Sequence, residues 1–374
     1  MIKLLSLFSG IGAFEKALTN LGVQYELVNY CEIDKYASKS YSAIHGIPES
    51  KNLWDITKVN VFNLPKDIDL LTYGFPCQDI SLAGKQKGMF NEDGTLTRSG
   101  LFFKALDIIE CVKPKIAIAE NVKALTSKKF TEEFKIVLDS LEKSGYHNYW
   151  QVLNAKDYGI PQNRERVFTV SIRDDSGIRK GAFLGTFYLE DYEANNFEFP
   201  EKQELKLKLK DMLEDEVDEK YYLTDSMIKT YQRDFGSKGK EIDLEHPIPT
   251  LTASMGTGGG NVPIIKSKCK RLEKLISNTE FEEGKVLNMD LYNQTTNENI
   301  SQCLTEPHHN SQRLFDGLRI RKLTPKECWR LMGFDDEDFE KASQVNSNTQ
   351  LYKQAGNSIV VNVLEAILNN LLEV

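Results

Sequence analysis

Short apolar runs alternate with segments of helical periodicity over residues 1–172, and this alternation constrains the fold more than any other feature of the sequence. The repetition predicts an α/β fold with a doubly wound, mostly parallel sheet that helices cover on both faces. Ligands of such sheets bind at the carboxyl ends of the strands, so the residues that follow each apolar run are the candidates for function. We expect strands at Lys3–Phe8, Tyr25–Cys31, Asp69–Tyr73, Lys115–Ala119 and Val167–Ile172, and helices at Ala37–Ala43, Leu101–Val112 and Thr131–Leu141.

The pattern changes after residue 172. Periodicity weakens, an acidic run appears at 214–219, and the glycines between Gly256 and Gly260 indicate a loop. We therefore expect a smaller, irregular domain over residues 173–334. Residues 335–374 end in an apolar stripe at helical spacing, and we expect this C-terminal segment to return to the first domain.

Composition narrows the class of protein. The chain has 374 residues, enough for two domains, and we find no run of about 18 apolar residues that would span a membrane. Forty-seven Lys and Arg against 55 Asp and Glu give a net charge of −8. That balance argues against non-specific coating of nucleic acid and leaves a local basic groove open. The six cysteines show no Cys-x-x-Cys and no zinc spacing, so we expect reduced thiols, no metal and an intracellular protein.

Three candidate binding positions follow apolar runs early in the chain. The glycines of Phe8–Gly12 lie where the first strand turns into the first helix, and they let a ligand approach the backbone or simply make a tight turn. The third glycine of the dinucleotide fingerprint is replaced by Glu15. Glu32 ends the second strand, where a carboxylate accepts hydrogen bonds from ribose hydroxyls or is a solvated turn residue. Asp55-Ile56 follows an expected strand end and is a weaker candidate for contact with an adenine.

Reactive side chains follow the later strands. Cys77 comes after a Gly-Phe-Pro turn at a strand end, where a thiol of lowered pKa can attack an electron-poor carbon; a buried, inert cysteine is the alternative. Glu120 leaves an apolar strand, a setting that raises a carboxyl pKa and favours proton donation. Arg164 and Arg166 share one face if the chain there is extended. Their convergence predicts a catalytic site, with the loop Ser81–Ser99 as a lid.

These positions together resemble the ordered motifs of the DNA (cytosine-5)-methyltransferase family of bacteria and phages. The matching stretches are Phe8–Gly12, Glu32, Asp55-Ile56, Pro76-Cys77-Gln78, Glu120-Asn121-Val122, Gln162–Arg166, Arg321–Phe334 and Gln354–Ser358. The resemblance covers the chain except for its variable middle. It implies a Rossmann-like, S-adenosylmethionine-dependent methyltransferase domain, with a target-recognition domain over 173–334 that ends in a hinge motif.

The resemblance also implies a reaction. A methyl group passes from S-adenosylmethionine, leaving S-adenosylhomocysteine, to carbon 5 of a cytosine flipped out of a short duplex DNA site. Cys77 attacks carbon 6, Glu120 hydrogen-bonds or protonates ring nitrogen 3, Arg164 orients the base, and Arg166 supports the site; no metal is implied. The residues implied in cofactor binding are Phe8, Gly10, Gly12, Glu32, Ile33, Asp55, Ile56, Pro76, Leu101, Asn357 and Ser358.

Contacts with double-stranded DNA are expected from three places. Ser81, Lys85 and Gln86 belong to the expected lid, and Thr250 and Thr252 to a Thr-Leu-Thr turn. Arg319 and Arg321 open a basic cluster with Lys322, Lys326 and Arg330, which holds phosphates or is a solvated surface. The resemblance further implies a cytoplasmic, nucleoid-associated monomer with no membrane partner, and it leaves a cognate restriction endonuclease open.

Other functions stay open at this point. A cytosine-5 methyltransferase acting on RNA belongs to the same family, and comparing methyl transfer to duplex DNA and to tRNA separates the two. A non-catalytic DNA-binding regulator with this fold would bind duplex equally well after Cys77→Ala. A nicotinamide-dependent oxidoreductase is disfavoured by Glu15 in place of the third glycine.

Overall fold

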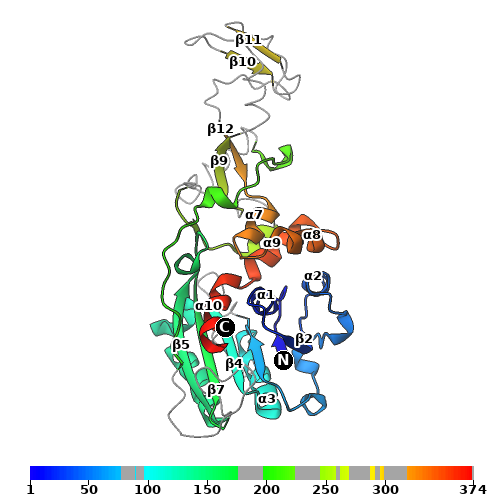
Figure 1. Cartoon of the computed structure of the whole chain (residues 1–374), viewed down its shortest axis with the longest axis vertical. Coiled ribbons are helices and arrows are strands. Elements are labelled where there is room, and N and C mark those ends of the chain that lie inside the picture. Colours follow the sequence, from blue (N-terminus) through cyan, green and yellow to red (C-terminus); the bar gives the residue numbers. More distant parts are fainter. Residues whose placement is uncertain are drawn as a thin grey trace.

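A six-stranded mixed sheet occupies the lower half of the molecule in Figure 1. The computed structural model describes residues 1–76, 89, 97–175, 197–223, 245–257, 262–268, 287–290, 295–298 and 318–372. The strands are β1 (Ile2–Leu7), β2 (Tyr25–Cys31), β3 (Leu70–Tyr73), β4 (Ile116–Val122), β5 (Tyr146–Asn154) and β7 (Glu165–Arg173), in the order β2-β1-β3-β4-β7-β5. The first four are parallel, whereas β7 runs antiparallel to both β4 and β5. The predicted α/β fold with a mostly parallel sheet is confirmed.

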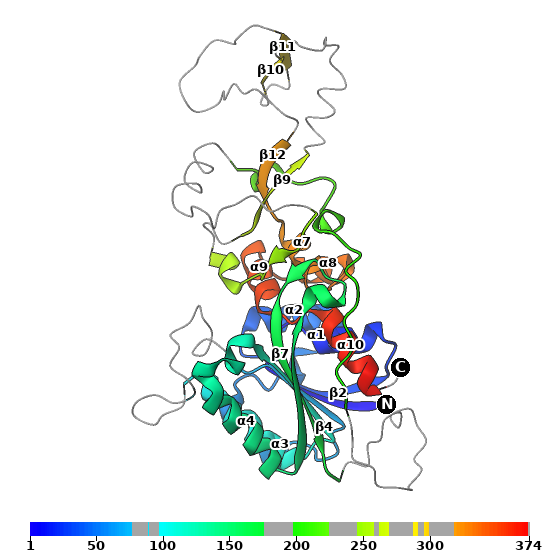
Figure 2. The ribbon, with the colours of Figure 1, turned by 90° about the vertical axis from the view of Figure 1, so that its left-hand side faces the viewer.

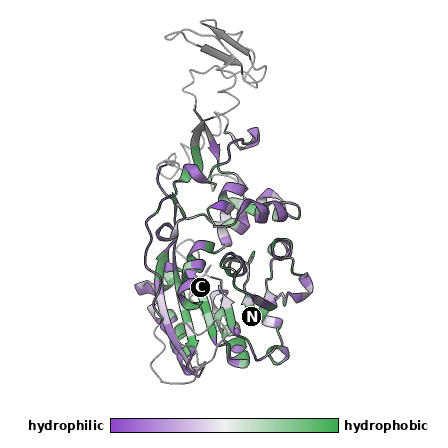
Figure 3. Ribbon diagram, in the orientation of Figure 1, coloured by the Kyte–Doolittle hydropathy of each residue, from purple (hydrophilic) through white to green (hydrophobic). Residues whose placement is uncertain are grey.

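Helices cover both faces of this sheet, as Figure 2 shows. Successive strand residues point to opposite faces, so Leu4 joins one apolar cluster and Leu5 the other. The elements on the Leu4 side are α1 (Ala13–Asn20), α2 (Lys35–His45) and α10 (Val361–Leu372), and those on the Leu5 side are α3 (Phe102–Val112) and α4 (Thr131–Lys143). Figure 3 shows the corresponding apolar strands between more polar outer surfaces. Burial of apolar surface on both faces is the main force that holds the sheet together.

The chain reverses its direction of travel across the sheet at β1. It passes from β1 to β2 on one side and then returns to β3 on the other side of β1. The loops that follow β1 and β3 therefore diverge at a switch point, where open α/β sheets bind ligands. After β1 the backbone bends through positive φ angles at Phe8 (53°), Gly10 (57°) and Gly12 (82°) before α1 begins.

The C-terminal residues form three more helices, α7 (Pro325–Arg330), α8 (Asp336–Ser343) and α9 (Asn348–Asn357), above the sheet in Figure 1. Helix α10 then packs against α1, so the ends of the chain lie close together in Figures 1 and 2. The continuous stretch Asn348–Leu372 is apolar and long enough to cross a membrane by length and composition alone. Its most apolar window is 61% buried inside the protein, which is the packing expected of core helices.

The upper part of the molecule contains short strand pairs. Strand β9 (Ile264–Lys268) pairs antiparallel with β12 (Leu318–Lys322), and β10 (Leu287–Asp290) with β11 (Thr295–Glu298). Strand β8 (Ile248–Pro249) pairs parallel with β6 (Gln162–Asn163), which joins this part to the chain just before β7. These pairs are short and separate, in contrast to the continuous sheet below them.

Residues 197–203 lie against the sheet domain, although the sequence assigns them to the second domain. The ring of Phe197 lies 5.9 Å from that of Tyr149 on β5, and the Tyr158 hydroxyl donates a hydrogen bond of 2.9 Å to the Pro200 carbonyl. Phe197 packs with Phe199 and buries apolar surface that would otherwise face water. These contacts place residues 197–203 beside the sheet.

Candidate active site

Glu32 is held firmly at the switch point. It follows β2 directly, and its carboxylate accepts hydrogen bonds from the backbone amides of Gly10 (2.8 Å) and Asp34 (2.7 Å). The buried Asn52 side chain accepts from the Glu32 amide (3.0 Å) and donates to the Glu32 carbonyl (2.9 Å). Burial raises the pKa of the Glu32 carboxyl above its ordinary value, and the two backbone amides oppose that rise. The result is a carboxyl group of fixed orientation beside the glycine loop.

The surroundings of Glu32 suit a nucleoside. A Cβ placed on Gly10 would meet no atom within 4 Å, so the backbone is open to a ligand on that side. Ile33 and Trp54 are large apolar side chains that remain 71% and 39% exposed, and Trp54 has a positive φ of 59°. A carboxyl group for ribose hydroxyls next to exposed apolar surface for a base is the chemistry that an adenosine group requires.

Gly12 has a packing role. A Cβ at this position would lie 2.1 Å from the Nε2 atom of His45, a residue of α2. Gly12 also has a φ of 82°, in the left-handed region that favours glycine. The close packing of α2 on the loop therefore requires glycine here, whatever ligand the loop binds.

The other expected cofactor residues divide into two groups. Phe8, Ile56 and Leu101 belong to, or pack against, the apolar cluster on the α3 side of the sheet, where Pro76 is half-buried at the end of the loop after β3. Asn357 is exposed and Ser358 is buried at the end of α9.

The strand expected before Asp55 is absent. Residues 32–69, all of which the structure describes, contain no strand, and their one β-type pairing is an isolated bridge between Tyr30 and Asn52. The left-handed backbone of Trp54 interrupts an extended conformation. Asp55 instead caps the short turn Ile56–Lys58, accepting a 3.0 Å hydrogen bond from the Thr57 amide.

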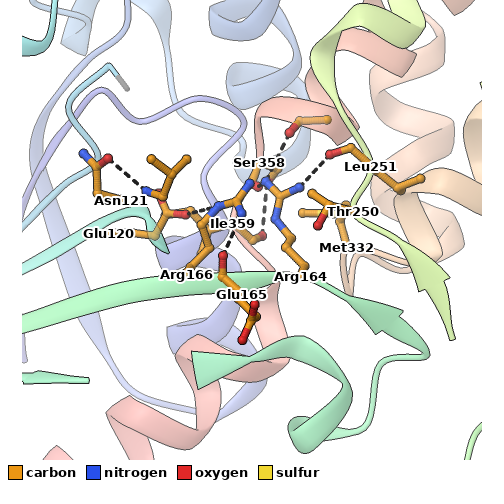
Figure 4. Close-up of polar contacts among 12 residues, drawn as sticks. Glu120, Asn121, Arg164, Glu165, Arg166, Thr250, Leu251, Met332, Ser358 and Ile359 are labelled. Atoms are coloured by element: carbon orange, nitrogen blue, oxygen red, sulfur yellow. Dashed lines mark hydrogen bonds and ion pairs between the residues drawn. The ribbon is translucent and has the colours of Figure 1, made fainter. Parts of the chain in front are cut away.

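Glu120 and Arg166 form the centre of the catalytic candidates. The Arg166 Nε atom lies 3.0 Å from Glu120 Oε1, and the two side chains are 17% and 14% exposed (Figure 4). Glu120 was expected just beyond the strand, but β4 continues to Val122 because β7 keeps pairing with it as far as Arg166. That register makes Glu120 and Arg166 diagonal neighbours on one face of the sheet.

The carboxyl group of Glu120 is a weaker acid than an ordinary glutamate. Burial raises the pKa of its carboxyl above the ordinary value, while the positive charges of Arg166 and Arg164 act in the opposite direction. The raised pKa favours a carboxyl group that carries a proton or donates a hydrogen bond. Hydrogen-bonding or protonating a ring nitrogen requires such a group.

The loop after β3 reaches Glu120. The Asn121 side chain donates a 3.1 Å hydrogen bond to the Phe75 carbonyl, and a Cβ on Gly74 would lie 3.7 Å from Glu120 Oε2. Pro76 is the last described residue before a gap in the description that begins at Cys77. Cys77 and the expected lid residues Ser81, Lys85 and Gln86 lie outside the described residues.

Arg164 has different partners from Arg166. Its buried guanidinium donates hydrogen bonds to the carbonyls of Leu251 (2.9 Å), Gly356 (3.1 Å) and Ser358 (2.6 Å) (Figure 4). Arg166 supplies the ion pair to Glu120. The two arginines expected on one face therefore serve different neighbours.

The prediction that Arg321 contacts DNA phosphates is wrong. Its side chain is 2% exposed and donates two hydrogen bonds, of 2.7 and 2.8 Å, to the carboxylate of Glu327. In the same cluster, Arg330 pairs with Asp336. These charges hold α7 in place, because a buried charge needs a partner that compensates for lost hydration. The side chain of Arg319 lies outside the part of the chain that the structure describes.

The two expected threonines lie at the base of the upper region. Thr250 is half-buried and donates a 2.8 Å hydrogen bond to the Asn163 carbonyl. Thr252 is exposed, and its hydroxyl lies 2.7 Å from that of Ser254. The exposed Thr252 leaves a hydroxyl at the surface next to the buried Leu251.

Three polar residues with structural roles in the site had no assigned role in the sequence. Asn52 holds Glu32 and Asn121 holds Phe75, as described above, while the buried Gln162 bonds to Leu251 and Leu331. Gln162 and Asn121 lie within the motifs Gln162–Arg166 and Glu120-Asn121-Val122, so the sequence could have indicated them as site residues. Asn52 is 20 residues from Glu32 and has no local signal. Among the described residues, no group of three or more metal-ligating side chains is found.

Comparison with known proteins identifies the family of this chain. Residues 2–373 match the family model for C-5 cytosine-specific DNA methylase. The orphan methyltransferase M.SPBetaI of Bacillus phage SPbeta is 36% identical, with 99% of this chain and 97% of that protein covered. The type II methyltransferase M.HhaI of Haemophilus parahaemolyticus is 31% identical, with 99% and 94% covered.

Solved structures share the fold. The crystal structure of the S. pombe Dnmt2 methyltransferase superposes with a TM-score of 0.60 at 18% identity, covering 100% of this chain and 99% of that one. A putative DNA modification methyltransferase of E. coli superposes with a TM-score of 0.57 at 17% identity, covering 100% and 99%. With the family model matched over almost the whole length, the chain belongs to the C-5 cytosine-specific DNA methylase family.

Proposed function

We propose that this DNA cytosine-5 methyltransferase transfers a methyl group from S-adenosylmethionine to carbon 5 of a flipped-out cytosine, within a short double-stranded site, through a transient bond to Cys77. The observation that carries the proposal is the buried Glu120, which is paired with Arg166 and adjoins the loop that leads to Cys77. Family membership supports DNA cytosine methylation, and the geometry supports an acid at ring nitrogen 3.

Bound S-adenosylmethionine would supply an electrophilic methyl group. The open backbone at Gly10, the oriented Glu32 carboxyl and the exposed Ile33 support a site for its adenosine part. The remaining proposed cofactor residues are Phe8, Gly12, Asp55, Ile56, Pro76, Leu101, Asn357 and Ser358. Glu32 would accept hydrogen bonds from the ribose hydroxyls, and the apolar residues would exclude water from the adenine.

The side chains of this protein would act on the cytosine in sequence. The Cys77 thiolate adds to carbon 6, forming a sulfur–carbon bond, while Glu120 protonates or hydrogen-bonds nitrogen 3 and holds the displaced electron pair in the ring. Carbon 5 becomes nucleophilic and accepts the methyl group. Its proton then leaves to water, the ring double bond re-forms, and the Cys77 thiolate is expelled as Glu120 regains its proton. Addition and elimination replace one unfavourable substitution.

We further propose a division of labour within a monomer. Residues 1–172 and 335–374 bind the cofactor and perform the chemistry, and residues 173–334 recognise the DNA site. Arg166 supports Glu120 at the base, while Thr250 and Thr252 contact the DNA backbone. The proposed partner is duplex DNA in the cell. Because relatives include both orphan and type II methyltransferases, the enzyme functions with or without a cognate endonuclease.

A trapping experiment tests the covalent step. Purified wild-type protein, Cys77→Ala and the control Cys111→Ala are each given duplex DNA whose target cytosine carries fluorine at carbon 5, together with S-adenosylmethionine. Fluorine cannot leave as a proton does, so the adduct accumulates. We expect a denaturation-resistant protein–DNA complex with the wild type and with Cys111→Ala, and none with Cys77→Ala. Methylation of duplex DNA by Cys77→Ala at more than a few per cent of the wild-type rate would refute the mechanism, and transfer to tRNA alone would refute the substrate.

A further inference from the structure

Two buried side chains on one short segment, Gln162 and Arg164, bond to the backbone of three other segments. We infer that this Gln162–Arg164 pair positions the DNA-contacting turn around Leu251 against the cofactor-side segment Gly356–Ser358, and thereby couples DNA binding to cofactor binding. The inference rests on the proposed function. It makes Arg164 a positioning residue, in place of the base-orienting contact expected from the sequence.

The peptide groups of Leu251 are held on both sides. Its amide donates a 3.0 Å hydrogen bond to the Gln162 side-chain oxygen, and its carbonyl accepts a 2.9 Å bond from Arg164 Nη1. The short pairing of β6 with β8 and the bond from Thr250 to Asn163 extend this attachment. Leu251 thus cannot shift without disturbing Gln162 and Arg164, and exposed Thr252 follows it directly.

The same two side chains reach the C-terminal segments. Arg164 Nη2 donates to the carbonyls of Gly356 (3.1 Å) and Ser358 (2.6 Å), and the Gln162 amide nitrogen donates to the Leu331 carbonyl (2.7 Å). Gly356 also packs directly on the turn, because a Cβ there would lie 2.1 Å from the carbonyl carbon of Thr252. Asn357 and Ser358, two of the proposed cofactor residues, are therefore adjacent in space to the proposed DNA-contacting turn.

The chemistry of the contacts calls for arginine. A guanidinium is a rigid, planar fork with five donors, so Nη1 and Nη2 can serve carbonyls on two different segments at once. A lysine has one ammonium group at the end of a flexible chain and cannot hold both segments in the same geometry. Lys at position 164 keeps the positive charge near Glu120 and loses the connection.

Coupling of this kind is reciprocal. If DNA shifts the Leu251 turn, the hydrogen bonds to Gly356 and Ser358 must shift with it, and cofactor affinity changes by the same factor as DNA affinity. Couplings between two such sites are typically about 5- to 150-fold. A residue that only touched the flipped base would change the rate of methylation and leave this factor unchanged.

The test measures the dissociation constant of S-adenosylhomocysteine by titration calorimetry, with and without a duplex that contains the target site. The variants are Arg164→Lys and Gln162→Met. The methionine fills a similar buried volume but cannot form the side-chain hydrogen bonds of Gln162 to Leu251 and Leu331. Arg173→Lys is the matched control, since it makes the same substitution at the other end of β7. Circular dichroism establishes that each variant is folded, and kcat and KM for DNA are measured in parallel.

We expect duplex to tighten S-adenosylhomocysteine binding in the wild type and in Arg173→Lys, and this factor to fall at least fivefold in Arg164→Lys and Gln162→Met. An unchanged factor in the folded variants, with kcat alone reduced, would overturn the inference and make Arg164 a contact to the base. If Arg164→Lys does not fold, Gln162→Met decides. Absence of methylation by the wild type would instead refute the proposed function.

Discussion

At the scale of single residues, the site depends on how burial and charge oppose each other at Glu120. The sheet withdraws its carboxyl from water and raises its pKa, and Arg166, 3.0 Å away, limits the rise. The Glu32 carboxyl is also buried, yet it accepts two backbone hydrogen bonds and has no arginine partner among the contacts described above. The two buried carboxyl groups therefore differ in their partners, an arginine side chain for Glu120 and two backbone amides for Glu32.

Replacement of Glu120 by Gln removes the acid while keeping its shape. We expect kcat to fall by about 10²- to 10⁴-fold, the usual contribution of general acid catalysis. The raised pKa keeps wild-type Glu120 protonated to higher pH than an ordinary glutamate, and methylation should decline as pH rises through that pKa. The Gln variant should lack this decline. Steady-state methylation rates across pH test both expectations, with the exposed Glu165→Gln as control; a rate within twofold of wild type would contradict them.

At the scale of elements, the buried ion pair between Arg321 and Glu327 fixes α7 against its neighbours. Glu327 bonds to Arg321 on β12, to the Thr324 amide (2.8 Å) at the start of α7, and to the Glu214 amide (2.9 Å). Tyr352 on α9 donates to the Leu323 carbonyl beside it. One carboxylate therefore joins the strand from the upper region, the helix and an incoming segment.

Removing one partner of this pair should be costly. Glu327→Ala leaves the buried Arg321 charge without its carboxylate, and we expect the free energy of unfolding to fall by about 3–5 kcal/mol. Urea denaturation followed by circular dichroism measures the loss. The double variant Arg321→Met with Glu327→Met should recover part of it, because no charge is then buried. A loss below 1 kcal/mol in Glu327→Ala would show that the pair does not hold α7.

The ion pair between Arg330 and Asp336 makes a pH-dependent contribution to the stability of the folded protein. The hydrogen bond from Arg330 lowers the pKa of Asp336 below its ordinary value. The stability it supplies is present above the ordinary pKa of about 4 and is lost as pH falls through the lower, folded-state pKa. Because Asp336 is 47% exposed, we expect Asp336→Asn to cost only about 0.5–1 kcal/mol at pH 7.

This cost should shrink as the pH falls below 4, since wild-type Asp336 then also becomes neutral. Urea denaturation at pH 7 and at acid pH tests the trend. Glu337→Gln, which alters an acid on the same helix that is 77% exposed, is the control. A cost that stays constant or grows toward acid pH would contradict the sign of the shift.

The sequence predicted those elements whose own residues carry a clear hydrophobic pattern. The central parallel strands β1, β3 and β4 contain apolar runs, as expected of strands buried on both faces. Strand β5 was missed because its sequence is largely polar and has no apolar run of the kind that indicates a buried strand. Arg321 was misassigned because the sequence does not distinguish an arginine that contacts phosphate from one that pairs with a buried carboxylate. Tertiary packing determines that its partner is Glu327.

At the scale of the whole molecule, the proposed division places chemistry and recognition in different parts of the chain. The sheet, its switch point and Glu120 form the lower part, while the paired strands β9 and β12 extend away from it in Figure 1. The Gln162–Arg164 pair and α7 join the two. Under the proposed division, the recognition part can vary while the chemical residues stay in place.

Exchange of the recognition segment tests this division. We expect a chimera that carries residues 173–334 of a relative with a known target to methylate that relative's site, because we propose that the side chains that read base edges belong to this segment. Digestion of methylated plasmid with enzymes blocked at each site reports the preference. The unchanged native chain and the unchanged relative serve as controls. A folded chimera that keeps the original preference would place recognition elsewhere.

Site-specific methylation of cytosine at carbon 5 is measured by bisulfite sequencing. DNA from cells that express the wild-type chain is compared with DNA from cells that carry Cys77→Ala and from an empty-vector control. The account predicts protected cytosines confined to one short motif in the wild type, and none above background in the other two. Soluble wild-type protein with no protected cytosines, or equal protection with Cys77→Ala, would contradict it.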